Sequence, residues 1–260
     1  MFSTTKALEQ MGSARDRVGS AIANASARTG VDFTYMMQQA KIESGFNPDA
    51  KARTSSATGL YQFIEQTWLG TVKKHGAAHG LESAANAISQ GRDGRYRVAD
   101  PATRTAILDL RRQPEAASAM AAEFAADNQQ YLETRLGRPM QSVDLYLAHF
   151  LGAGGAERFL SAHEANPDAP AASLLPDAAR ANRSIFYASS GSPRSLSEIR
   201  ERFAAKLGGS SATPLNRPPA QANDFAQMRM AAASIPAQPA AGPTPTYARL
   251  AYLMLAELGG

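Results

Sequence analysis

The most informative stretch of the chain runs from Glu43-Ser44-Gly45-Phe46-Asn47-Pro48 to Gly59-Leu60-Tyr61-Gln62-Phe63. Asp32 is a suitable N-cap for a helix, and an apolar face follows it, formed by Phe33, Met36, Met37 and Ala40. The continuation of this helix places Glu43 on or beside that face, and Gly45 and Pro48 then end it. The sequence therefore predicts a carboxyl group at the end of a helix and at the edge of an apolar surface.

Glu43 has the setting that a general acid needs. An acid that works near neutral pH has to keep its proton, and both burial and the partial negative charge of a helix C-terminus favour the protonated form. Ser44 offers a hydroxyl group to the same neighbourhood. The spacing alone also fits an ordinary surface glutamate at a frayed helix end.

Helical patterns dominate on both sides of this stretch. Residues at helical spacing from Leu8 to Ala25 predict a first helix that ends near Gly30, and further helices are expected after Asp100-Pro101, Pro114, Ser142 and the capping box of Ser195 and Glu198. No run alternates apolar and polar residues convincingly, so strands should be scarce. We therefore expect a mainly α fold, with the single Trp68 in its core.

The composition divides the chain into three parts. We expect an N-terminal helix over residues 1–30, a helical domain over residues 31–207, and a Pro/Ala-rich, partly disordered linker over residues 208–260. Within this last part, residues 224–233 and 247–258 have the pattern of short helices. The terminal helix is expected to dock on a partner or on its own domain.

Charge and cysteine content exclude several classes of protein. The net charge is +4 and the basic residues are dispersed, which argues against a nucleic-acid partner. The chain has no cysteine, so disulfides, thiol nucleophiles and thiolate metal sites are excluded. The first thirty residues are not a secretory signal as written, and the apolar stretch from Leu250 to Leu258 is too short for a transmembrane segment.

The two quoted segments together resemble the soluble lytic transglycosylase catalytic domain, which has a lysozyme-like fold. In that family a Glu-Ser pair precedes a Gly-Leu-Met-Gln type motif, and the resemblance covers roughly residues 31–203. It implies that Glu43 is the catalytic acid and base, that Ser44 supports the sugar or the acid, and that Gln62 binds substrate. Tyr61 stands where the family often has Met. A buried amide that staples a loop is the structural alternative for Gln62.

A third family motif, Ala-Tyr-Asn-Ala-Gly, matches less well. Here Ala148-His149-Phe150-Leu151-Gly152 keeps only the first and last residues. The resemblance suggests His149 as a substitute polar contact, with Tyr146, Phe150 and Tyr187 as further substrate-binding residues. The alternatives are a structural histidine and helix-core aromatics.

The family mechanism needs a single acid. No convincing second carboxylate accompanies Glu43, and the resemblance implies cleavage between N-acetylmuramic acid and N-acetylglucosamine with formation of a 1,6-anhydro sugar. The alternatives are a muramidase of the same fold, which delivers water, and a non-catalytic peptidoglycan-binding module. No metal or organic cofactor is expected, because His75 and His79 have no third ligand beside them.

The resemblance also implies a location and partners. Peptidoglycan glycan strands are the expected partner, which places the protein in the periplasm or outside the cell. Without a visible signal peptide, we hypothesise export through a secretion or flagellar apparatus that the C-terminal tail recruits.

Overall fold

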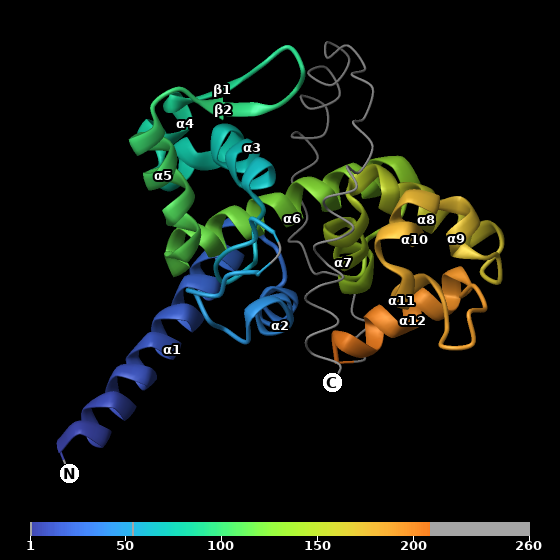
Figure 1. Ribbon diagram of the computed structural model, residues 1–260, viewed down its shortest axis with the longest axis horizontal. Helices are drawn as coiled ribbons and strands as arrows, with labels where there is room; N and C mark the ends of the chain where they lie inside the picture. Colours follow the sequence, from blue (N-terminus) through green and yellow to red (C-terminus); the bar gives the residue numbers. More distant parts are fainter. Residues whose placement is uncertain (1, 54, 209–260) are drawn as a thin grey trace.

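The computed structural model describes residues 2–53 and 55–208, with side chains from residue 15 onward, and it is mainly α-helical (Figure 1). The first half contains α1 (Phe2–Thr29), α2 (Phe33–Ser44), α3 (Glu65–His75), the 3-10 helix η1 (Gly76–His79), α4 (Glu82–Ala87), α5 (Pro101–Asp109) and η2 (Leu110–Arg112). The second half contains α6 (Pro114–Leu136), α7 (Ser142–Leu151), α8 (Ala153–Ala165), α9 (Ala171–Leu174), α10 (Pro176–Ala181), α11 (Arg183–Phe186) and α12 (Leu196–Lys206). The helices expected within residues 224–233 and 247–258 lie outside the described residues.

The long helix α6 is the centre of the molecule. Figure 1 shows it running between α1–α5 at one end and α7–α12 at the other, and it contacts α1, α2, α3, α7 and α8. Its first half is built almost entirely from buried small residues between Ala116 and Ala125. Small side chains let neighbouring backbones approach closely on several sides, so one helix can serve as the common core of both groups.

Most of the expected helix signals are confirmed. The Asp100 carboxylate accepts a hydrogen bond from the Thr103 amide at 2.7 Å, and the capping box of Ser195 and Glu198 is present. Trp68 is fully buried and its indole donates to the Ile107 carbonyl at 2.7 Å. The expected boundaries at residues 30 and 207 remain predictions, and α1 packs along α6.

Two details differ from the expectations. A short antiparallel hairpin, β1 (Ile88–Gln90) paired with β2 (Tyr96–Val98), was not predicted, because three-residue strands carry no alternating pattern long enough to recognise. The N-cap of α7 is Gln141 rather than Ser142, and Gln141 forms a reciprocal capping box with Asp144. Asp144 is completely buried, and Arg138 and Arg200 both pair with it. This pairing joins α12 to the start of α7.

Arg111 holds the loop between α2 and α3 in place. Its guanidinium group donates to the carbonyls of Ser56 at 2.7 Å and Phe63 at 3.0 Å. The backbone of Gly59 packs so closely on Arg111 that a Cβ atom at position 59 would lie 1.9 Å from the Arg111 carbonyl oxygen. Gly59 also has φ +87°, a conformation that favours glycine.

Gly59→Ala should therefore destabilise the fold by more than the cost of placing an alanine in a left-handed backbone conformation. We expect a loss of at least about 3 kcal/mol in the free energy of unfolding, because the overlap with Arg111 adds to the cost of the positive φ. Gly80→Ala is the matched control, since Gly80 has φ +74° but open space around a Cβ, and it should cost about 1 kcal/mol. Urea unfolding measures both, and equal losses would contradict the close packing.

Candidate active site

Glu43 and His149 meet between α2 and α7. The Oε1 atom of Glu43 lies 3.0 Å from Nε2 of His149. The Glu43 side chain is only 3% exposed, whereas the His149 side chain is 22% exposed. The carboxyl group is therefore almost dry, and the imidazole ring lies on its more exposed side.

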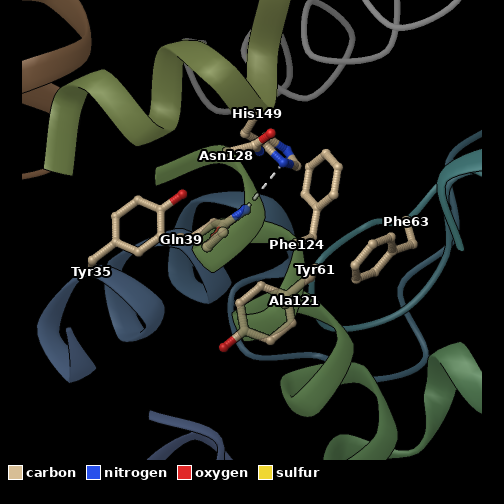
Figure 2. Close-up of a pocket in the computed structure, with 9 residues that line it drawn as sticks. Tyr35, Gln39, Tyr61, Phe63, Ala121, Phe124, Asn128 and His149 are labelled. Atoms are coloured by element: carbon tan, nitrogen blue, oxygen red, sulfur yellow. Dashed lines mark hydrogen bonds between the residues drawn. The ribbon is translucent and has the colours of Figure 1, made fainter. Parts of the chain in front are cut away.

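One face of α2 carries the polar groups of the site. Tyr35, Gln39 and Glu43 follow one another at intervals of four residues, so their side chains lie in a row along the helix. The other ring nitrogen of His149, Nδ1, lies 3.2 Å from the Gln39 Nε2 atom (Figure 2). Among the residues that the structure describes, the buried Oε1 atom of the same amide has no hydrogen-bond partner. His149 is thus held between a glutamate and a glutamine that are one helical turn apart.

The negative charge of Glu43 affects the pKa of two buried phenol groups. Burial raises the pKa of Tyr35, and the negative charge of Glu43 raises it further. Tyr146 on α7 shows the same two effects, with burial again the larger cause, and its pKa lies well above the usual range. Both side chains therefore remain neutral O–H groups at ordinary pH.

A lysine reaches the same region from α12. Burial is the main reason that the pKa of Lys206 is lowered, and the charge of Arg202 lowers it too, while Glu43 acts in the opposite direction. No sequence motif pointed to Tyr35, Gln39 or Lys206 as residues of this site. The four-residue spacing before Glu43 was the available signal for the first two, whereas nothing in the sequence places Lys206 beside α2.

A small cavity lies next to His149 and Gln39 (Figure 2). Its volume is about 10 Å³, and it is lined by Tyr35, Gln39, Tyr61, Phe63, Ala121, Phe124, Ala125, Asn128 and His149. Phe124 and Asn128 also line a wider, more open hollow of about 500 Å³ on α6. The rest of that hollow is formed by Lys74, Asp127, Gln130, Tyr131, Thr134, Arg135 and Ala153. Amide, hydroxyl and aromatic groups thus continue from the buried pair toward the surface.

The polar side chains of the first two motifs form hydrogen bonds to backbone carbonyl groups of the protein itself. The Ser44 hydroxyl donates to the Leu60 carbonyl at 2.8 Å and so joins the end of α2 to the following loop. The Gln62 amide is buried and donates to the carbonyls of Ala50 at 3.0 Å and Gly59 at 2.8 Å. Tyr61 lines the small cavity, but its hydroxyl is buried and donates to the Met36 carbonyl at 3.2 Å. These contacts match the structural alternative for Gln62.

The other expected binding residues lie in different surroundings. Phe150 is a core residue that packs edge-on against Phe203, and Tyr146 is buried and lies against the ring of His149. Tyr187 follows α11, where the guanidinium of Arg183 lies over its ring at 4.7 Å. Tyr187 therefore does not line the cavity beside His149.

The side chains of His75 and His79 each contact a carboxylate group of α6. Nε2 of His75 lies 2.9 Å from Asp127, and Nε2 of His79 lies 2.6 Å from Glu123. Within residues 2–53 and 55–208, no group of three or more His, Cys, Asp or Glu side chains has the arrangement of a metal site.

Comparison with known families identifies the region that carries the first two motifs. Residues 20–142 match the family described as Transglycosylase SLT domain. The match contains Glu43, Ser44, Tyr61 and Gln62 and ends at the first residue of α7, so His149 lies beyond it. At the level of the family, this domain indicates peptidoglycan-lytic activity of the transglycosylase type. The described helices include none with the length and apolar character required to cross a bilayer.

Gln62→Glu tests the role of the buried amide in the loop. The substitution keeps the shape but points a carboxylate at two carbonyl oxygens, so we expect the free energy of unfolding to fall by about 3 kcal/mol at pH 8. Protonation at pH 4 returns one O–H donor, and the loss should then be smaller. The exposed Gln113 provides the control Gln113→Glu, which should change stability by less than about 0.5 kcal/mol. Equal effects of the two substitutions would refute a stapling role.

Proposed function

The chain carries a transglycosylase SLT domain over residues 20–142, and we propose that it is a peptidoglycan lytic transglycosylase with Glu43 as its acid and base. The substrate is the β-1,4 bond between N-acetylmuramic acid and N-acetylglucosamine, and the product carries a 1,6-anhydro-muramyl end. The observation that carries the proposal is the nearly dry carboxyl group of Glu43, on the motif where the family resemblance places the catalytic acid.

Two proton transfers complete the proposed reaction. Glu43 first donates a proton to the glycosidic oxygen as the bond from that oxygen to C1 of the muramyl ring breaks. The proton leaves with the 4-hydroxyl group of N-acetylglucosamine. Glu43, now a carboxylate, then takes the proton of the muramyl 6-hydroxyl as O6 bonds to C1. Every atom of the product comes from the substrate, so no water is consumed.

The surroundings of Glu43 support this chemistry. A carboxyl group that is largely removed from water is favoured in its neutral form, which is the form that donates a proton. Tyr35 and Tyr146 are neutral hydroxyl groups within the electrostatic reach of Glu43, so they add no negative charge that would compete with the carboxylate formed after the first transfer.

Glu43→Gln should abolish the anhydro product. An amide of the same shape cannot donate or accept the transferred proton, so we expect at least a 100-fold loss of turnover on isolated sacculi, within the usual contribution of acid–base groups of about 10² to 10⁴. Mass spectrometry of the released muropeptides provides the measurement. Glu82→Gln, at an exposed residue of α4, is the matched control and should retain activity.

Other outcomes identify the alternatives. Reducing muramyl ends in place of anhydro ends would make the protein a muramidase that delivers water. Binding of sacculi without any cleavage by the wild-type chain would make it a non-catalytic peptidoglycan-binding module. Either result would overturn the lytic transglycosylase assignment.

We place the protein where its substrate is, in the bacterial periplasm or outside the cell, as part of cell wall remodelling. We also propose that residues 208–260 dock on a secretion or flagellar apparatus, because their Pro-rich composition suits an extended recognition segment. Cell fractionation of the native host should find the full chain outside the cytoplasm, and removal of residues 208–260 should reduce that fraction. Exclusive recovery from the cytosol would contradict both proposals.

A further inference from the structure

The contact between Glu43 and His149 goes beyond the single acid of the proposed function, on which this inference rests. We propose that the two side chains act as one acid–base unit that holds one transferable proton between Glu43 Oε1 and His149 Nε2. His149 is therefore assigned a role in the proton transfers themselves, rather than only a hydrogen bond to substrate.

The geometry suits a shared proton. The two atoms are 3.0 Å apart, which is the length of a hydrogen bond between nitrogen and oxygen. A carboxylic acid beside a neutral imidazole and a carboxylate beside an imidazolium contain the same number of protons and the same net charge. A nearly dry carboxylate is costly unless a charged partner is bonded to it, so the imidazolium form compensates the buried charge.

Gln39 fits both states of the imidazole. When Nδ1 of His149 carries no proton, it accepts a hydrogen bond from Gln39 Nε2, which lies 3.2 Å away. A half-turn of the amide brings Gln39 Oε1 to the same place, where it accepts a proton from Nδ1 of the imidazolium. That oxygen is buried, and in the present orientation it has no partner within residues 2–53 and 55–208. The amide therefore leaves the imidazole free to change its charge.

The other groups around the pair do not compete for this proton. Tyr35 from α2 and Tyr146 from α7 remain protonated because their pKa values are raised. From α6, Asn128 and Phe124 line the adjoining cavity, and neither titrates. Lys206 on α12 lies near the positive charge of Arg202. Its own positive charge interacts favourably with the carboxylate of Glu43. The transferable proton is therefore assigned to the Glu43–His149 pair, whose two atoms lie 3.0 Å apart.

The proton balance of the two steps is preserved. Before cleavage the pair holds one proton, which passes to the glycosidic oxygen as the C1–O bond breaks. The pair is then a carboxylate beside a neutral imidazole. The proton of the muramyl 6-hydroxyl returns to the pair as O6 bonds to C1, and the starting state is restored.

The pH profile of turnover tests the proposal. Wild-type kcat should decline with rising pH in the range where imidazole titrates, since the active pair must hold its proton. In His149→Gln, kcat at pH 7 should fall at least tenfold, with KM changed less than threefold, and the decline should move to lower pH by more than one unit. His149→Tyr should show the same shift, because a phenol can bond to the carboxyl group but does not titrate there.

His163→Gln is the matched control. His163 lies on α8, where its ring contacts the Ser197 hydroxyl at 3.3 Å, and the same substitution there leaves the pair untouched. Its profile should equal that of the wild type. A wild-type profile shape in His149→Gln or His149→Tyr, whatever the change in overall rate, would overturn the proposal.

A second measurement does not depend on catalysis. The chain has four histidines, so ring ¹⁵N spectra of the full-length protein can follow each one, and the His149 signal is the one missing from His149→Tyr. Glu43→Gln should lower the midpoint of the His149 titration by at least one unit, because the neighbouring negative charge is removed. An unchanged midpoint would refute the pairing. Persistence of anhydro products in Glu43→Gln would instead refute the proposed function, while the titration still decides whether the pair exists.

Discussion

A carboxyl group that is almost entirely removed from water has to be neutral or bonded to an opposite charge, and this requirement governs the arrangement around Glu43. The fold meets it by bringing α7 against the last turns of α2, with the imidazole of His149 at 3.0 Å. Tyr35 and Gln39 on α2 and Tyr146 on α7 complete the surroundings. The positions of His149 and Tyr146 relative to Glu43 depend on the distance between α2 and α7, which are far apart in sequence.

That distance is set by a rigid scaffold. Asp144 anchors the start of α7 to Arg138 and Arg200, while Arg111 and Gly59 fix the loop that follows α2. Ser44 joins the two parts of that loop region by its bond to Leu60. These contacts combine buried charges with backbone carbonyls, and such contacts have little freedom to adjust. The polar residues of the first two motifs thus bond to backbone carbonyl groups of the helix that carries Glu43 and of the loop that follows it.

The sequence allowed the helices to be predicted because their signals are local. Asp32, Asp100 and Ser195 cap the helices that follow them, and Gly45 ends α2 in a left-handed conformation. The hydrogen bonds of Gln62 and Tyr61 were harder to foresee, since an amide or a phenol beside a cleft looks the same in sequence whether it faces ligand or backbone. The contact of His149 with Glu43 joins residues of two distant helices, and no local pattern encodes it.

The third motif has a histidine at position 149 where the family pattern has a tyrosine, and this histidine contacts Glu43. A tyrosine at position 149 would offer the acid a hydroxyl group, but Tyr35 and Tyr146 already provide hydroxyl groups that sense its charge. A histidine at this position keeps a hydrogen-bond donor and adds a group that exchanges protons near neutral pH. The substitution thus changes what the acid can do without removing what stabilises it. The proposed acid–base unit thus includes His149, which lies outside the part of the chain that matches the SLT domain.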